Sequence, residues 1–247
     1  MLDRQSPKPL YAQLEDIVRQ KIENEEWLPN HLIPSENEIS KMYGVSRMTA
    51  RGVITRLVHE GLLYRAQGKG TFVSVPKIVS KPLSQLGIRE QLEQMGYQIS
   101  TKLLNIDKGI PPARVSKELR LEKNTQVYVV ERIRYIKEEP LSLHTSYIPV
   151  TFCANLEMKD MEGIQLCDIL EKEYDLKIVK IVETLESSMA TLEEAKMLSV
   201  KKGFPLLLLE NIVYTTGELP FEYTKVLFRG DKIKLRLEYH KNINHCP

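Results

Sequence analysis

The chain has few cysteines, and they are not arranged as a cross-link or a metal site requires. Three of its 247 residues are cysteine, at Cys153, Cys167 and Cys246. Their number is odd, their spacing is wide, and no CxxC pair or cysteine–histidine cluster occurs. We therefore expect no disulfide framework, no metal and no other cofactor. Free thiols fit the reducing cytoplasm.

Long apolar runs and common enzyme motifs are also lacking. No stretch approaches the roughly 20 apolar residues of a membrane span, and the first residues, MLDRQSPKPLY, contain no signal-peptide core. We therefore expect a cytoplasmic protein with no membrane partner. The GxSxG, HExxH, Walker and GxGxxG motifs are absent, which argues against the enzyme classes that carry them.

The whole chain carries no large excess of positive or negative charge, but one segment of it is clearly basic. The 35 lysines and arginines and the 33 aspartates and glutamates leave a net charge of +2, which by itself points to no partner. Between Lys41 and Val75, however, six cations accompany a single anion, Glu60. A basic segment of this kind attracts a phosphate backbone, so nucleic acid becomes a candidate partner.

The basic segment has the pattern of a helix followed by a hairpin. Ser46 is a suitable N-cap, and Gly61 suits the positive φ that often ends a helix. Two β-prone runs, 62–66 and 71–73, flank residues 68–70, Gly-Lys-Gly, which predicts a hairpin with a cation at its tip. Between the helix ends, apolar residues recur at the spacing of one buried stripe: Ala50, Val53, Ile54, Leu57 and Val58.

A helix and hairpin of this composition suit B-DNA. Arg47, Arg51 and Thr55 form one flank of the helix, and Thr49 and Arg56 lie on the other. The major groove accepts a helix, arginine grips guanine there, and a basic tip can follow the phosphates or enter the minor groove. The alternative is a solvated amphipathic helix beside an ordinary hairpin.

Two helices upstream favour the DNA interpretation. The first should have Pro9 at its N1 position and end near Glu25. The second should open at Ser35, with Glu38 completing a capping box, and Gly44 should turn the chain into the basic helix. Three helices and a two-stranded wing would make one compact module.

Residues 9–75 resemble the winged helix-turn-helix of the GntR family of bacterial transcription regulators. The matching segments are PLYAQLEDIVRQKI, LIPSENEIS, YGVSRMTAR and LVHEGLLYRAQGKGTFV. Asn37 departs from the family, which usually has a basic residue there, and Gly52 replaces a polar helix former at a cost of about 1 kcal/mol in helix propensity. The resemblance implies DNA contacts by these residues: Ser35, Glu36, Ser46, Arg47, Thr49, Arg51, Arg65, Gly68, Lys69, Gly70 and Thr71.

Beyond the DNA-binding domain, which we place at 1–75, the pattern changes. Residues 76–83 are interpreted as an extended linker, with an edge strand of the next domain as the alternative. Short connections such as 137–140, 216–220 and 229–231 indicate hairpins, so an α+β domain with an antiparallel sheet is predicted over 84–247. Its helices are expected at 86–95, 112–119, 165–174 and 191–199, and its strands at 99–107, 126–137, 141–148, 178–189, 206–215, 221–228 and 232–239.

One predicted strand places two arginines on an apolar face. Arg132 and Arg134 are two residues apart, so their side chains point the same way, about 7 Å from one another. Guanidiniums on such a face need a carboxylate partner or a bound anion. Two interpretations therefore stay open: ion pairs with glutamates of neighbouring strands, or a phosphate or carboxylate held in the bidentate manner of arginine.

Residues 84–247 resemble the UTRA ligand-sensing domain of the HutC-type branch of the GntR family, which has a chorismate-lyase-like fold. The matching segments include VYVVERIRYIKEEPLSLHTSYIP and EEAKMLSVKKGFPLLLLENIVYTTGELPFEY. Members that sense phosphorylated amino sugars differ at His144, at Gln165 and at the pair Ile88-Arg89. The resemblance implies an effector pocket lined by Arg89, Arg132, Arg134, His144, Gln165 and Glu222, with Tyr223 close by.

The resemblance implies a sequence-specific transcription regulator, similar to repressors of N-acetylglucosamine utilisation. Such a protein binds a palindromic operator as a homodimer and responds to a small anionic effector. A sugar phosphate is the first candidate and a small carboxylate the next, while His144 could equally be a hydrogen-bonded core histidine. Two other classes stay open. One is a lyase-like enzyme, because a fold does not determine function; the other is a non-specific architectural DNA binder.

Overall fold

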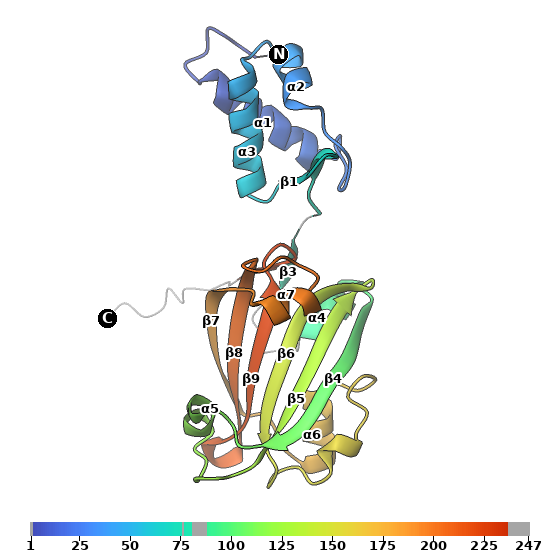
Figure 1. Cartoon of the computed structure of the whole chain (residues 1–247), viewed down its shortest axis with the longest axis vertical. Helices are drawn as coiled ribbons and strands as arrows, with labels where there is room; N and C mark the ends of the chain where they lie inside the picture. Colours follow the sequence, from blue (N-terminus) through green and yellow to red (C-terminus); the bar gives the residue numbers. More distant parts are fainter. Residues whose placement is uncertain (1, 76, 81–87, 237–247) are drawn as a thin grey trace, which may run out of the picture. The chain divides into compact units, whose positions relative to one another are not determined.

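The computed structural model forms two compact units, Met1–Lys77 and Ile78–Pro247 (Figure 1). It describes residues 2–75, 77–80 and 88–236. The expectations that fall on 76, 81–87 and 237–247 therefore lie outside the described residues. They concern parts of the expected linker, the start of the helix at 86–95, the end of the strand at 232–239, and Cys246.

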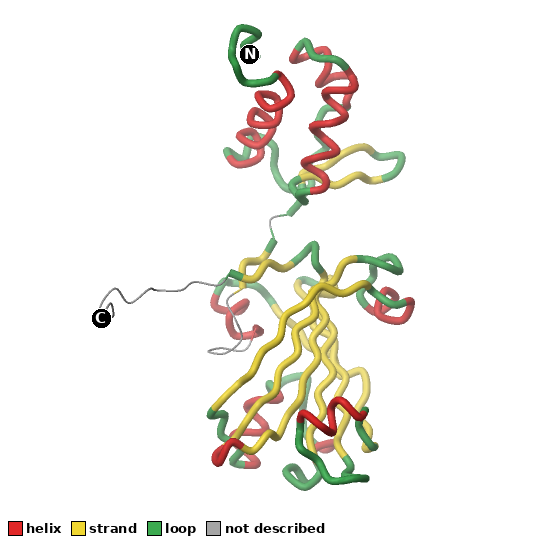
Figure 2. Tube along the Cα trace, turned by 90° about the vertical axis from the view of Figure 1, so that its left-hand side faces the viewer, coloured by secondary structure: helices red, strands yellow, loops and turns green. Residues whose placement is uncertain are grey.

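The first unit contains three helices and a hairpin. The elements are α1 (Leu10–Glu23), α2 (Glu36–Tyr43), α3 (Arg47–His59), β1 (Leu63–Ala66) and β2 (Gly70–Val73). The two strands pair antiparallel, and the hairpin projects from the side of the helices in Figure 2. This is the predicted winged helix-turn-helix.

Side-chain caps define where these helices begin. Ser35 and Glu38 form the predicted capping box of α2, with the Ser35 backbone N–H donating to Glu38 Oε2 at 2.8 Å. Ser46 caps α3, its hydroxyl accepting from the backbone N–H of Thr49 at 3.0 Å. Pro9 is the N-cap of α1 and not its N1 residue, because its ψ of 146° is extended.

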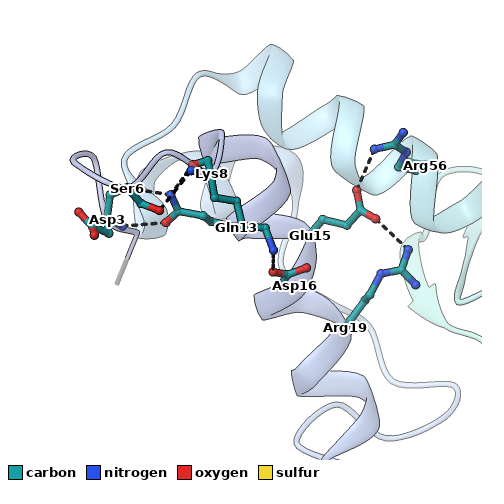
Figure 3. Close-up of polar contacts among 8 residues, drawn as sticks. All are labelled: Asp3, Ser6, Lys8, Gln13, Glu15, Asp16, Arg19 and Arg56. Atoms are coloured by element: carbon teal, nitrogen blue, oxygen red, sulfur yellow. Dashed lines mark hydrogen bonds and ion pairs between the residues drawn. The ribbon is translucent and has the colours of Figure 1, made fainter.

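A carboxylate of α1 links that helix to α3. Glu15 accepts hydrogen bonds from Arg19 at 2.8 Å and from Arg56 of α3 at 3.2 Å (Figure 3). The bond from Arg19 is the main cause that lowers the pKa of Glu15. Arg19 also pairs with Glu60, just beyond the end of α3. Arg56 is thus paired within the unit, on the flank of α3 that faces α1.

A six-stranded antiparallel sheet organises the second unit. In spatial order its strands are β4 (Ile99–Gly109), β5 (Val127–Ile136), β6 (Glu139–Pro149), β9 (Leu219–Arg229), β8 (Pro205–Thr215) and β7 (Lys180–Met189). The predicted hairpins β5–β6 and β8–β9 are present, and β9 lies between β8 and β6. The fold class is therefore α+β, as predicted.

Two short strands pair outside this sheet. Strand β3 (Ile78–Ser80), within the expected linker, runs parallel to β10 (Ile233–Leu235). The expectation that the turn at 229–231 makes another hairpin was wrong. Because β6 and β8 already flank β9, both edges of β9 are occupied, and the chain after it pairs with β3 instead.

Helices cover both faces of the sheet. The face that carries Arg132 and Arg134 is called the inner face here. It packs against α4 (Ile88–Gln94) and α6 (Leu166–Tyr174), which lie toward opposite ends of the strands in Figure 1. The outer face packs against α5 (Ala113–Glu118) and α7 (Leu192–Met197). Two 3-10 turns complete the unit, at Leu156–Met158 and Thr216–Glu218.

Two glycines of the first unit should respond oppositely to alanine. A β-carbon at Gly52, inside α3, would have no packing neighbour within 4 Å, so Gly52→Ala should stabilise the unit by about 0.5–1 kcal/mol through helix propensity. Gly70 has φ +119° and its Cβ would meet Leu32 at 2.5 Å, so Gly70→Ala should destabilise the unit. Denaturation followed by the fluorescence of Trp27, the single tryptophan, measures both; equal shifts in the same direction would contradict the described backbone.

Candidate functional site

The start of α3 presents two free cations. Arg47 and Arg51 are exposed, and within residues 2–75 neither guanidinium makes a hydrogen bond or ion pair. Thr49, also predicted to contact DNA, is half-buried, and its hydroxyl lies 2.8 Å from that of Ser46. Ser46 and Thr49 therefore hold the first turn of α3, and the two arginines extend from the first and second turns.

A third predicted cation is partly engaged. Arg65 of β1 donates to Glu36 at the start of α2 at 3.1 Å and to Thr55 of α3 at 2.9 Å. The structure thus brings Glu36 and Arg65 together with the flank of α3 that carries Arg51. The Arg65 side chain is 41% exposed, so the ion pair contributes less than about 1 kcal/mol and a phosphate could compete for the guanidinium.

The hairpin tip has the backbone that its glycines predict. Gly68 and Gly70 have φ of +73° and +119°, and Lys69 between them is exposed. Thr71, in contrast, lies half-buried on β2, where its carbonyl accepts from the N–H of Ile33 at 2.9 Å. The segment before α2 therefore pairs with β2 and supports the wing, a pairing that the sequence pattern did not reveal.

In the second unit, polar side chains form a band across the inner face of the sheet. The register places Arg132 opposite His144 and Arg134 opposite Ser142, and all of these side chains are buried. One apolar cluster, which includes α6, lies on one side of the band, and another, which includes α4, lies on the other. Glu222 belongs to the same face, on β9.

Hydroxyl groups connect one arginine of the band to its carboxylate. Arg132 Nη2 donates to Ser146 Oγ at 3.3 Å, and the Ser146 hydroxyl lies 3.1 Å from that of Thr224. Thr224 in turn donates to Glu222 Oε1 at 2.7 Å. Arg132 Nε is buried without a partner in the described part of the chain. The band can therefore accept further hydrogen-bonding groups.

Neither arginine of the band is paired with a carboxylate. Among residues 88–236, no Asp or Glu oxygen lies within 4.0 Å of the guanidinium of Arg132 or Arg134. Burial, and then the charge of Arg132, lowers the pKa of Arg134 to about 9. Burial also lowers the pKa of Arg132, against the pull of Glu222. Direct ion pairs of these arginines with glutamates, one of the two interpretations, do not occur among the described residues, whereas a bound anion would offset both effects.

His144 contributes a neutral ring to the band. Its Nε2 lies 2.8 Å from Ser142 Oγ, and the ring meets Phe228 edge-on with centroids 6.2 Å apart. Burial, followed by the charges of Arg134 and Arg132, holds the pKa of His144 well below its usual value. The side chain is hydrogen-bonded in the core, as one of the two interpretations expects, and at the same time lies between the polar groups of the band.

Two predicted pocket residues lie on the helices that cover the inner face. Arg89 of α4 donates to Glu93 at 2.8 Å, and its charge helps to lower the pKa of Arg134. Gln165 is the N-cap of α6 and makes no side-chain bond to that helix. Burial raises the pKa of Cys167, in the first turn of α6, and the charge of Arg134 opposes this rise. Leu166 beside it packs in the same apolar cluster as Val130 of β5, so the start of α6 adjoins the band.

Tyr223 does not lie on the inner face with the other residues of the predicted pocket. Successive side chains of a strand point to opposite faces, so Tyr223 lies on the outer face while Glu222 and Thr224 lie on the inner one. Its hydroxyl donates to Glu210, which also pairs with Arg114 of α5. The prediction that Tyr223 lies close to the pocket was wrong for this reason.

Sequence reasoning also missed residues of the band. Ser142 and Ser146 alternate with His144 in a strand that is otherwise largely apolar, and this period of two was the available signal. Asn211 of β8 lies opposite Thr224, and its Oδ1 is buried without a partner in the described part of the chain. A lone asparagine gave no such signal.

Two other kinds of feature are absent from the described residues. These residues hold no group of three or more His, Cys, Asp or Glu side chains that could bind a metal ion. They also include no helix with the length and apolar character needed to cross a membrane.

Comparisons with known proteins agree with both halves of this description. Residues 10–73 match the model for bacterial regulatory proteins of the gntR family, and residues 94–234 match the UTRA domain. The chain is 31% identical to the HTH-type transcriptional repressor NagR of Bacillus subtilis over 94% of this chain and 95% of that one. It is 25% identical to the mannosyl-D-glycerate transport/metabolism system repressor MngR of Escherichia coli, over 93% and 95%.

The fold has counterparts among solved structures. The crystal structure of PhnF from Mycobacterium smegmatis superposes with a TM-score of 0.65 at 21% identity, covering 93% of this chain and 98% of that one. The relatives are transcriptional regulators and not lyases, which removes the enzyme alternative. The chain belongs to the gntR family of bacterial regulatory proteins, as a DNA-binding transcription regulator whose second unit carries a UTRA effector domain.

Proposed function

We propose that this regulator is a repressor that leaves its operator when a small anion binds the inner face of the UTRA domain. Residues 1–75 bind DNA, 76–83 link the domains, and 84–247 bind the effector and pair two chains into a homodimer in the cytoplasm. Repressor names among the relatives support this proposal. A dimer presents two recognition helices to the two half-sites of a palindrome.

The DNA contacts rest on the free cations of the first unit. Arg47 and Arg51 extend from the first turns of α3 and Lys69 from the wing tip, each exposed and unpaired within residues 2–75. Arginines near the start of a recognition helix can read base edges, while a lysine at a narrow tip suits a phosphate or the minor groove. Ser35 and Ser46 act chiefly through the caps that orient α2 and α3.

The effector proposal rests on one observation: two buried guanidiniums lie on one strand face without a carboxylate in reach. A phosphate or carboxylate would neutralise Arg132 and Arg134, with Arg89 and the start of α6 beside them. His144, Glu222 and Asn211 would hydrogen-bond the rest of the molecule. A sugar phosphate suits this arrangement best; a small carboxylate comes next, and the glycerate named for one relative belongs to that class.

Effector and operator are coupled through the arrangement of the domains. An anion that binds one arrangement of the dimer more tightly than another shifts the population toward it, by no more than the difference in affinity. A duplex that the full-length protein selects from a random-sequence library, called the selected duplex, stands for the operator in the binding measurements.

Replacing Arg51 should weaken specific DNA binding only. Arg51→Ala should raise the Kd for the selected duplex by roughly 5- to 150-fold for each half-site, which corresponds to about 1–3 kcal/mol for one base contact, and leave binding to random duplex nearly unchanged. Lys69→Ala should weaken binding to the selected duplex and binding to random duplex to a similar degree, as expected for a phosphate contact. Fluorescence anisotropy at fixed salt measures all four affinities.

Arg56→Ala is the matched control for Arg51. It removes an arginine from the same helix, but from the flank where Arg56 pairs with Glu15. Specific binding should survive this change. If Arg51→Ala behaves like Arg56→Ala, α3 does not read the operator through Arg51.

Removing Arg134 should abolish the response to anions and stabilise the free protein. Sugar phosphates and small carboxylates that bind raise the Tm of the wild type by mass action. Arg134→Met keeps most of the length of the side chain but removes its charge. Its free form should therefore be more stable by about 1 kcal/mol or more, because an unpaired buried charge is gone, while its Tm should no longer respond to the anion.

Lys172→Ala serves as the control in the thermal-shift screen. Lys172 lies on α6, but its side chain is 72% exposed, so this variant should keep the full response. A compound that shifts Arg134→Met as strongly as the wild type binds elsewhere. A screen in which neutral metabolites alone raise the Tm would contradict an anionic effector.

A further inference from the structure

The residues before α1 form an ordered arm. Gln13 of α1 holds it with three hydrogen bonds: its Oε1 accepts from the N–H of Asp3 at 2.8 Å, and its Nε2 donates to the carbonyls of Asp3 and Lys8 at 2.8 and 2.7 Å (Figure 3). Leu2 packs against the helical core. The arm, residues 2–8, is therefore part of the folded unit.

The arm brings one guanidinium to the turn between α2 and α3. Arg4 Nη2 donates to the carbonyl of Gly44 at 2.9 Å. Gly44 ends α2 in the left-handed conformation with φ +63°, and two residues later Ser46 caps α3. A cation is favourable at the carbonyl end of a helix, so this bond stabilises the turn. It also fixes the guanidinium beside the start of the recognition helix.

Most donors of this guanidinium stay available. Arg4 is exposed, and in the described part of the chain its one bond is to Gly44, with no carboxylate within 4.0 Å. The other cation of the arm is different, because Lys8 pairs with Asp16 of α1. Arg4 thus joins Arg47 and Arg51 near one end of α3 as a cation without an anion.

We propose that Arg4 contacts a phosphate of the operator while it holds the turn before the recognition helix. The proposal rests on the proposed DNA contacts of α3. With α3 in the major groove, groups at the turn that leads into it lie near the rim of the groove, where backbone phosphates are. A guanidinium already held by one bond can give its remaining donors to a phosphate at little further entropic cost.

The salt dependence of binding tests the phosphate contact. Each phosphate neutralised by a cation contributes about 0.9 to the slope of log K against log salt. Arg4→Gln should therefore reduce the slope by about 0.9 per protomer on the selected duplex and on random duplex alike. Lys8→Gln, which removes a charge from the same arm, should leave the slope unchanged because that ammonium is paired.

A purely structural role would give a different result. If Arg4→Gln lowers the Tm and the affinity but keeps the wild-type slope, Arg4 only holds the turn and the proposal is overturned. Arg4→Lys keeps the charge, so it should keep the slope even if the turn is weakened. Arg51→Ala in the same series separates the two proposals: a wild-type affinity there refutes the role of α3, whatever Arg4 does.

Discussion

Two like charges buried side by side constrain the whole inner face of the effector domain. Arg132 and Arg134 lie on one strand, and burial together with mutual repulsion lowers the pKa of Arg134 to about 9. Every neighbour fits this constraint. His144 is kept neutral, serine and threonine hydroxyls separate Arg132 from Glu222, and apolar clusters close the band on two sides. An anion bound against this strand face would offset both the repulsion and the cost of burial.

In the DNA-binding unit the unpaired cations are exposed to solvent, whereas in the effector domain they are buried. Hydration stabilises the charge of the exposed cations without an ion-pair partner. The cations between α1 and α3 are paired instead: Arg19 of α1 and Arg56 of α3 both pair with Glu15. The unit therefore keeps a compact core and still presents unneutralised charge on one side. Buried charge in one domain favours selective binding of a small anion, and exposed charge in the other favours a polyanion.

Local signals in the sequence were sufficient for most of the fold. Caps at Ser35 and Ser46, the apolar stripe of α3 and the glycines of the wing lie within a few residues of what they control, and each was predicted. The alternation of β5 likewise placed Arg132 and Arg134 on one face. The placement of Tyr223 near the pocket followed the family resemblance, and it was wrong because strand side chains alternate between faces and Tyr223 lies on the outer one.

The amino-acid sequence by itself determined the element types, the family and the placement of two arginines on one face, because these depend on short-range periodicity and capping. Only the tertiary structure decided what those arginines face. The order of β5, β6, β9 and β8 brings Ser146 against Arg132 and places Thr224 and Asn211 further along the same face, and within residues 88–236 no glutamate comes within ion-pairing distance. It likewise showed that the arm before α1 reaches the turn at Gly44, forty residues further along the chain. Contacts of this range depend on how strands and helices pack, which local patterns do not encode.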